Sequence, residues 1–248
     1  FDAHYAPAPE LPVCLRFASW VGGDMDGNPN VDAGTISAAL ETQRGLILGR
    51  YRKDLSHLAR ILSQSTTRVP VAAPVLARIE DYRLRLPKAA AKLKPRHADM
   101  PYRTLLALMA ARLTATEQEK INGYRNADGF IGDLELIGDS LRAHRGEHAG
   151  LFALTRVLRR ARSFGFHLAT LDVRQDSAVH SEAIGACLGD EGFASRAIGD
   201  RVEVLHRILD AAPGGCDPEL PAARSTLAVF RTLAAARAQY GGAALGPY

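Results

Sequence analysis

The sequence predicts a mostly α-helical fold with a few parallel strands. Apolar residues recur at three- and four-residue steps along most of the 248 residues, the spacing that lines one face of a helix. Two short segments, near residues 13–21 and 166–173, instead alternate in the manner of strands. A long, mostly helical stretch separates them, so they cannot form a hairpin and are expected to pair in parallel, with helical crossovers.

In chain order, the first strand is followed by a Gly-, Asn- and Pro-rich patch at 22–30 and then by helical periodicity over about 32–65. This run is one long helix or a helix pair, because Ile36, Leu40 and Ile47 continue one apolar face while Gly45 and Gly49 interrupt it. A basic segment at 88–97 is expected to be a solvated loop or helix end. Further helices are predicted near 74–86, from Pro101 onward, and near 130–145, 147–163, 178–188, 198–211 and 221–239.

The composition excludes several classes of protein. The 31 Lys and Arg residues against 27 Asp and Glu give a net charge of +4 that is spread along the chain, so no nucleic-acid partner is expected. No apolar run approaches the roughly 20 residues of a membrane span, and the first residues lack the pattern of a signal peptide. Cys14, Cys187 and Cys216 form no C-x-x-C, which predicts neither a disulfide framework nor a zinc cluster and favours a reducing, cytoplasmic setting.

The turn after the first strand carries the densest set of chemically useful residues. Gly22 and Gly23 permit close backbone approach, while Asp24, Asp26 and Asn28 can bind a cation, hold the loop or cap the next helix. One interpretation is a tight turn followed by an N-cap at Asp32. An EF-hand is excluded because it requires Gly and Glu at the positions of Pro29 and Thr35. The D-x-D-G pattern is also similar to haloacid-dehalogenase-type phosphatases, although two glycines separate the strand from Asp24.

A second polar segment follows the second strand. Arg174 can clamp a phosphate or carboxylate through its planar guanidinium, with Gln175 and Asp176 orienting it. The alternative is a structural Arg–Asp pair at a strand end. In parallel α/β architectures, sites collect at the carboxyl ends of the strands, where both polar segments fall.

Together the two segments resemble phosphoenolpyruvate carboxylase. The first motif, F-x-S-W-x-G-G-D-x-D-G-N-P-N-V, covers residues 17–31, and the second, F-G-x-x-L-x-x-L-D-x-R-Q-[ED]-S, covers residues 164–177. A P-Y-R at 101–103 lies between them. The resemblance spans nearly the whole chain but covers only an internal segment of that enzyme. Residues 1–248 are therefore expected to form a single region of a longer chain, an expectation that the absence of an initiator Met supports.

The resemblance implies a partial (β/α)8 barrel with long helical insertions, from a cytoplasmic, homotetrameric and allosteric lyase. Such an enzyme forms oxaloacetate and phosphate from phosphoenolpyruvate and bicarbonate with Mg²⁺ or Mn²⁺, a carbon-fixing reaction that replenishes the tricarboxylic acid cycle. Arg174 then matches the arginine that contacts the substrate phosphate, and Trp20 the wall of the pocket for the methylene group. Asp24, Asp26 and Asn28 organise the active-site loop, and Arg103 is assigned to an allosteric sugar-phosphate site.

The chain departs from the family pattern in two ways. Met25 and Thr170 stand where many members carry Arg, or Arg or Lys, which is expected to remove two positive charges near an anionic site. The family's catalytic His and Lys and its metal-binding carboxylates lie outside this segment, so the segment alone is expected to be inactive and to bind no metal.

Two other functions remain open. A non-catalytic helical interaction or scaffold domain makes the loop a simple turn and Arg174 a structural ion pair. A D-x-D phosphatase makes Asp24 a nucleophile. The enzyme and the scaffold differ in one geometric respect: the enzyme requires Trp20, Asp24 and Arg174 in one shared cleft, whereas the scaffold leaves them in three separate places.

Overall fold

Helix α1, Ala33–Ile61, decides between the one-helix and two-helix predictions, because it continues without a break through Gly45 and Gly49. It begins after Asp32, whose side-chain Oδ1 accepts the Thr35 backbone N–H at 2.8 Å, as an N-cap residue does. The hydrogen bonds from Thr35 lower the pKa of the Asp32 carboxyl below its usual value. The predicted N-cap is confirmed.

The computed structural model describes residues 12–211 and 220–248, and these divide into two compact units. Unit 1 contains residues 12–17 and Gln43–Leu168, and unit 2 contains Ala18–Thr42 and the described part of Ala169–Tyr248. The sequence predicts a single region of a longer chain, because no Pro- or Gly-rich linker marks the points where the chain passes between the units, within α1 and within the strand segments. That this region belongs to a longer chain stays a prediction.

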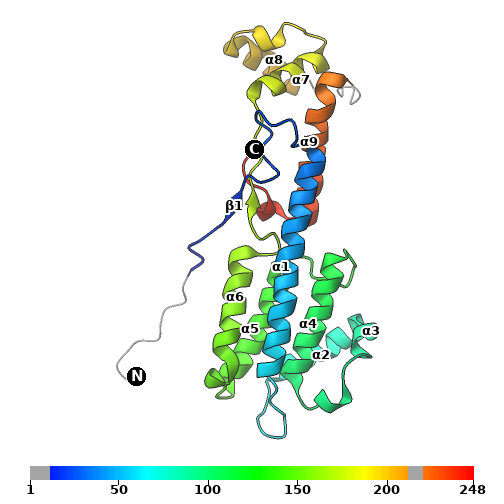
Figure 1. Cartoon of the computed structure of the whole chain (residues 1–248), viewed down its shortest axis with the longest axis vertical. Helices are drawn as coiled ribbons and strands as arrows, with labels where there is room; N and C mark the ends of the chain where they lie inside the picture. Colours follow the sequence, from blue (N-terminus) through cyan, green and yellow to red (C-terminus); the bar gives the residue numbers. More distant parts are fainter. Residues whose placement is uncertain (1–11, 212–219) are drawn as a thin grey trace, which may run out of the picture. The chain divides into compact units, whose positions relative to one another are not determined.

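Unit 1 is a helix bundle (Figure 1). Besides its part of α1 it contains α2 (Ala73–Arg85), α3 (Pro87–Ala90), α4 (Pro101–Glu117), α5 (Ala127–Ala143) and α6 (Phe152–Phe164). A 3-10 helix, Pro95–His97, follows α3 in the segment predicted to be solvated, and a π-helical turn, Glu147–Leu151, precedes α6. Each predicted helix of this unit is confirmed to within a few residues, since apolar periodicity is a local signal.

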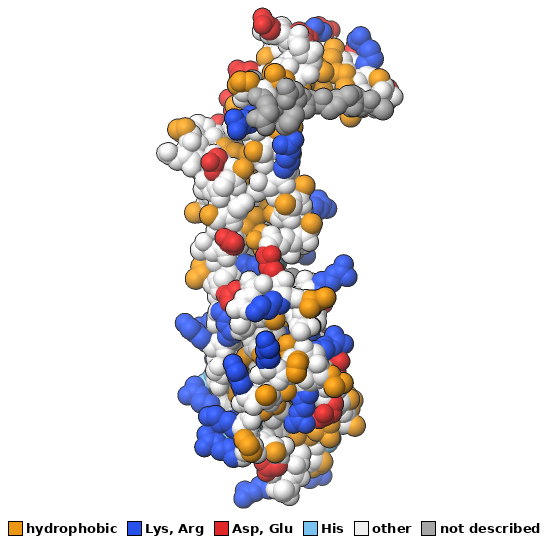
Figure 2. Space-filling view, turned by 90° about the vertical axis from the view of Figure 1, so that its right-hand side faces the viewer, with side chains coloured by type: hydrophobic (Ala, Val, Ile, Leu, Met, Phe, Trp, Pro, Cys, Tyr) orange, Lys and Arg blue, Asp and Glu red, His pale blue; other side chains and the backbone are white. Residues whose placement is uncertain are grey.

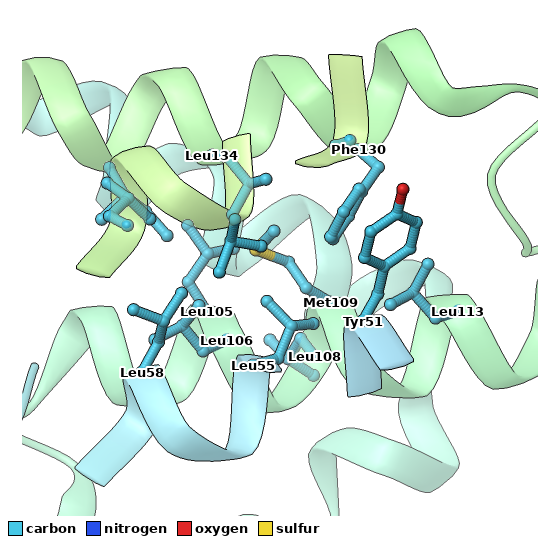
Figure 3. Close-up of a cluster of buried hydrophobic side chains, with 14 of the residues drawn as sticks. Tyr51, Leu55, Leu58, Leu105, Leu106, Leu108, Met109, Leu113, Phe130 and Leu134 are labelled. Atoms are coloured by element: carbon cyan, nitrogen blue, oxygen red, sulfur yellow. The ribbon is translucent and has the colours of Figure 1, made fainter. Parts of the chain in front are cut away.

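The core of unit 1 is formed by apolar residues of α1, α2, α4, α5 and α6, and Figure 3 labels those from α1, α4 and α5. Full burial of each Leu, Met or Phe side chain contributes about 1.5–3 kcal/mol, so this cluster supplies much of the stability of the bundle. The labelled members are Tyr51, Leu55 and Leu58 from α1, Leu105, Leu106, Leu108, Met109 and Leu113 from α4, and Phe130 and Leu134 from α5.

One carboxylate lies inside this apolar bundle. Asp133 on α5 is fully buried and accepts hydrogen bonds from Tyr124 Oη at 2.6 Å, from Tyr82 Oη and from Arg78 Nη1. The guanidinium of Arg112 stacks over the Tyr124 ring at 3.9 Å and donates to the Tyr82 hydroxyl. Burial, followed by the charge of Asp133, raises the pKa of both tyrosines. Three donors therefore surround the one buried charge.

Unit 2 contains the two strands and the remaining helices of the described residues. Strands β1 (Ala18–Ser19) and β2 (Thr170–Leu171) pair in parallel, with Ala18 opposite Thr170 and Ser19 opposite Leu171. The parallel pairing is confirmed, but each strand is only two residues long rather than eight or nine. The other elements are α7 (Ser177–Leu188), a 3-10 helix (Phe193–Ser195), α8 (Ile198–Asp210), α9 (Pro221–Tyr240) and a second 3-10 helix (Gly242–Ala244).

A small apolar core fixes unit 2 around β2. Leu171 and Val173 pack with Met25 and with residues of α1 and α9. Leu245 forms a further parallel bridge to Leu171, so β2 has a neighbour on each side, which the sequence interpretation did not include. Cys14 is a free thiol, whereas Cys187 is disulfide-bonded, and the expectation that the cysteines form no disulfide is therefore wrong at Cys187. None of the helices among the described residues is sufficiently long and apolar to span a membrane.

Candidate functional site

The two polar segments meet directly beyond the paired strands. Past Ser19 and Leu171 the parallel pairing resumes at an isolated bridge between Asp24 and Arg174. Six residues lead from Ala18 to Asp24 but only four from Thr170 to Arg174, and the two extra residues are taken up by a turn. The backbone N–H groups of Gly23 and Asp24 both donate to the Trp20 carbonyl, at 2.9 and 3.2 Å, and close that turn.

The glycines of this turn are required by contacts that leave no space for a side chain. A Cβ atom at Gly23 would lie 2.3 Å from the backbone oxygen of Asp172, closer than any real contact. Gly22 has a φ of +85°, and a Cβ there would lie 2.7 Å from the Cβ of Ala39. The pair of glycines therefore lets the loop pass directly beside the end of β2, which places Asp24 next to Arg174.

Arg174 is the centre of the resulting group. Its Cζ lies 5.3 Å from the centre of the Trp20 ring, and its guanidinium nitrogens lie 3.9 Å from Asp24 Oδ2 and 3.5 Å from Asp26 Oδ2. We call Trp20, Asp24, Asp26 and Arg174 the Arg174 cluster. The Arg174 side chain is 48% exposed and, among the described residues, it donates no hydrogen bond within normal range. The exposed part of the guanidinium can therefore donate to a planar anion.

Asp24 has an oxygen without a partner. Its Oδ1 atom is shielded from solvent and accepts no hydrogen bond in the described part of the chain. A shielded acceptor that is left unsatisfied costs about 1–3 kcal/mol, so native sites rarely keep one without a donor from elsewhere. The cluster therefore has an acceptor and a set of donors that this segment does not satisfy.

Gln175 and Asp176 do not orient Arg174, so that part of the sequence interpretation is wrong. The Asp176 carboxylate accepts the Ala178 backbone N–H at 2.9 Å and caps α7. The Gln175 side-chain oxygen accepts the Asp176 backbone N–H at 2.8 Å. The carboxylates that face the guanidinium belong instead to Asp24 and Asp26, which are remote in sequence.

Asn28 stabilises the loop and does not contact the guanidinium of Arg174 within the described set of contacts. Its side-chain oxygen accepts the Asn30 backbone N–H at 3.1 Å, and its backbone N–H donates to the Met25 carbonyl at 3.1 Å. Asn28 also lines a hollow of about 830 Å³ in unit 2, together with Asp176 and residues of α9. No member of the Arg174 cluster is among the described residues that line this hollow.

Comparison with known proteins decides the family. The model of the family described as phosphoenolpyruvate carboxylase matches residues 2–248. The chain belongs to this family. It is 49% identical over 250 residues to the phosphoenolpyruvate carboxylase of Xanthomonas oryzae pv. oryzae and 50% identical over 254 residues to that of Xanthomonas euvesicatoria pv. vesicatoria. It is 35% identical over 256 residues to that of Ralstonia nicotianae.

These alignments include nearly all of this chain but only part of each relative. They cover 98% of the chain for the two Xanthomonas proteins and 95% for the Ralstonia protein. The covered share of the relatives is 27% and 25%, respectively, so the chain spans about a quarter of the length of the curated relatives it matches. The family resemblance seen in the sequence is confirmed, and the roles of individual residues stay predictions.

Met25 and Thr170, which stand where many family members carry a basic residue, both contact other parts of unit 2. The Met25 side chain is 7% exposed and packs in the core of unit 2, whereas its neighbours Asp24 and Asp26 face Arg174. Successive side chains of extended backbone point to opposite sides, which explains the separation. The Thr170 hydroxyl donates to the Ala243 carbonyl at 3.0 Å. That these two residues remove positive charge near an anionic site stays a prediction.

Arg103 lies in unit 1, in the first turn of α4, whereas the Arg174 cluster belongs to unit 2. Arg103 is one of several basic residues near His97. Burial, followed by the positive charges of Arg103, Arg96 and Lys94, lowers the pKa of His97. The anion site at Arg103 stays a prediction.

The described residues contain no group of three or more His, Cys, Asp or Glu side chains that could hold a metal ion. In the Arg174 cluster, Asp24 and Asp26 are both engaged by the guanidinium. The side chains described here thus do not fit a Mg²⁺ site.

Proposed function

We propose that this chain is part of an enzyme that converts phosphoenolpyruvate and bicarbonate to oxaloacetate and phosphate. The observation that carries the proposal is the Arg174 cluster, a half-exposed guanidinium held beside an indole and two carboxylates just beyond two paired parallel strands. A chain of this family with that constellation is expected to bind the family's substrate there. A scaffold domain requires no such grouping. In a D-x-D phosphatase the nucleophilic Asp directly ends a strand, whereas two glycines precede Asp24 here, which disfavours a phosphatase.

In the proposed reaction a bicarbonate oxygen attacks phosphorus, and the bond between phosphorus and the enol oxygen breaks. Carboxyphosphate and the enolate of pyruvate result. Carboxyphosphate then releases carbon dioxide and phosphate, and the enolate carbon forms the new C–C bond to carbon dioxide. Negative charge spreads over the phosphoryl oxygens during transfer, so the role of Arg174 is to hold those oxygens with its fixed, always-charged fork.

Trp20 and the loop residues act around that clamp. The Trp20 ring is 57% exposed beside the guanidinium, and we assign it to the wall that covers the substrate methylene and keeps water from the enolate. Asp24 and Asp26 lie close enough to position the guanidinium without forming short, saturating bonds to it. Asn28 holds the loop that carries both carboxylates.

The rest of the proposal concerns the protein to which this segment contributes. The two parallel strands are assigned to an incomplete (β/α)8 barrel with long helical insertions. Mg²⁺ or Mn²⁺, when bound, neutralises charge on the reacting groups, and we assign its ligands and the catalytic His and Lys to parts of the relatives' length that this chain does not span. A cytoplasmic homotetramer with allosteric control, including an anion site at Arg103, completes the proposal.

The test is carboxylase turnover of the full-length protein, coupled to malate dehydrogenase, for the parent and its Arg174→Ala variant. Removal of a charged donor that stabilises the transition state lowers turnover by about 10²–10³-fold. The matched control is Arg196→Ala, which removes an arginine that pairs with Asp190 in the same unit and is 41% exposed. We expect the control to keep its turnover.

Two results would refute the proposal. A folded Arg174→Ala enzyme with unchanged turnover would reduce Arg174 to a structural residue. A parent enzyme that is inactive, and that either binds no substrate analogue or binds it away from the Arg174 cluster, would favour the scaffold function. Arg174→Lys separates charge from geometry, since lysine keeps the charge but loses the bidentate fork.

A further inference from the structure

Unit 1 contains a concentration of positive charge in a groove between α1 and α6. The groove has a volume of about 340 Å³, and four cationic side chains line it: Arg50 and Lys53 from α1, and Arg156 and Arg160 from α6. One carboxylate, Asp54, also lines it. We call this concavity the α1–α6 groove. The Arg174 cluster belongs to unit 2 and contributes no residue to it.

Helical spacing places these charges on facing surfaces. Residues 50, 53 and 54 lie within one turn and a half of α1, and residues 156 and 160 are one turn apart on α6. Leu58 and Val157 also line the groove, but they are only 0% and 4% exposed and belong to the core of the bundle, so the charged side chains dominate its accessible surface. The sequence could not show this arrangement, since the two helices are about a hundred residues apart.

Asp54 neutralises only part of the charge. It accepts from Arg50 Nε at 3.1 Å and from an Nη1–H of Arg160, which fixes both guanidiniums at the groove. Lys53 and Arg156 are exposed, and neither forms an ion pair with any described residue. Four cations against one carboxylate leave an excess of positive charge, and this excess attracts a multiply charged anion more strongly than a singly charged one.

The wider surroundings strengthen this field. Residues 43–168 of unit 1 contain 23 Lys and Arg but only 11 Asp and Glu. Unit 2 contains 7 Lys and Arg and 14 Asp and Glu. Lys and Arg side chains accordingly gather over the unit 1 helices in the face that Figure 2 shows. The expectation that charge is evenly spread along the chain is therefore wrong at the level of the two units. Such a field raises the local concentration of anions at a concave surface.

We propose that the α1–α6 groove binds a small anion that carries one or more phosphate groups. Guanidinium forks match phosphate oxygens in pairs, and Lys53 adds a mobile point charge at the rim. A single carboxylate would compensate only one of the excess charges. The proposal does not depend on the carboxylase activity proposed above.

The first experiment is calorimetric titration of the full-length protein with inorganic pyrophosphate, at low ionic strength and without divalent metal. The test variant is Arg50→Gln/Arg156→Gln, which changes two exposed side chains and leaves the Arg160–Asp54 pair intact. The matched control is Arg159→Gln, an exposed arginine on α6 that does not line the groove. Loss of two charge-assisted contacts weakens one class of pyrophosphate site about tenfold or more, while the control stays within about twofold.

A second measurement locates the bound anion without any mutation. Lys53 is exposed and lines the groove, so pyrophosphate is expected to slow its acetylation by an amine-reactive reagent, followed by mass spectrometry. Lys88 on α3 is exposed outside the groove and serves as the internal control. Protection of Lys53 alone, with weaker binding by the double variant, supports the proposal. Equal acetylation of both lysines at saturating pyrophosphate, or unchanged affinity in the double variant, overturns it and assigns the groove to an acidic protein segment or to solvent.

Discussion

Replacement of Asp133 by Ala tests whether the buried carboxylate of unit 1 stabilises the bundle. The change leaves the Tyr124 and Tyr82 hydroxyls without their acceptor, and these side chains are only 4% and 1% exposed. Each buried donor left unsatisfied costs about 1–3 kcal/mol. Arg78 is 38% exposed and regains water, so it adds little. The two donors together give about 2–6 kcal/mol. The middle of that range matches the loss of about 3–5 kcal/mol that breaking a buried ionic group usually causes, and we expect a loss of that size.

The assay is hydrogen exchange of α5 peptides in the full-length protein, because global unfolding of a protein with two units is not a single transition. A loss of about 3–5 kcal/mol lowers protection by roughly a hundredfold to a few thousandfold, at 1.4 kcal/mol for each factor of ten. Asp139→Ala is the control on the same helix, since Asp139 forms an exposed pair with Arg142 and is worth at most about 1 kcal/mol. Equal protection in the two variants would show that the tyrosines find other acceptors and that the predicted loss of stability is wrong.

Two further predictions concern the glycines and a partly buried histidine. Gly23→Ala places a Cβ against the Asp172 carbonyl and is expected to lower the stability of unit 2 by about 1–3 kcal/mol and to reduce carboxylase turnover. Gly45→Ala adds a Cβ in open space inside α1 and is expected to raise stability by about 0.5–1 kcal/mol. Calorimetry of both variants checks this, and a Gly23→Ala protein as stable as the parent would contradict it. Burial lowers the pKa of His167 below its ordinary 6.5, so the unfolded chain binds a proton first as pH falls, and stability is lost from about pH 6.5 down to the native pKa. Protection of α6 at pH 7 and pH 5 should differ less in His167→Gln than in the parent, and identical pH dependence in both proteins would assign the effect to another group.

The helices could be predicted because their signal is local, whereas the strands and the units could not be bounded. The apolar face through Ile36, Leu40 and Ile47 recurs every turn, and α1 is continuous as that face requires. Alternation over 13–21 indicates a strand but does not say where a partner is present, and within the described residues only Ala18 and Ser19 pair with β2. Helical periodicity likewise says nothing about how one helix divides between two units.

The candidate site shows the same division between local and distant information. The motifs identify Trp20, Asp24, Asp26 and Arg174 by residue type, and the structure brings them together. Sequence proximity gave the wrong partners for Arg174, because Asp176 is used to cap α7. A signal was present in the Gly22-Gly23 pair, since two adjacent glycines before an Asp indicate that another backbone passes close by.

That close approach explains why the two motifs form one structural unit. Arg174 N–H donates to the Gly23 carbonyl at 3.0 Å, and Met25 N–H donates to the Arg174 carbonyl at 2.9 Å, so the backbones fix each other's register. With this register, alternation directs Asp24 and Asp26 toward the guanidinium and Met25 into the core. A one-residue slip would bury a carboxylate and expose Met25, which the cost of burying an unpaired charge forbids. The apolar residue between the two aspartates therefore helps to hold the charged residues in position.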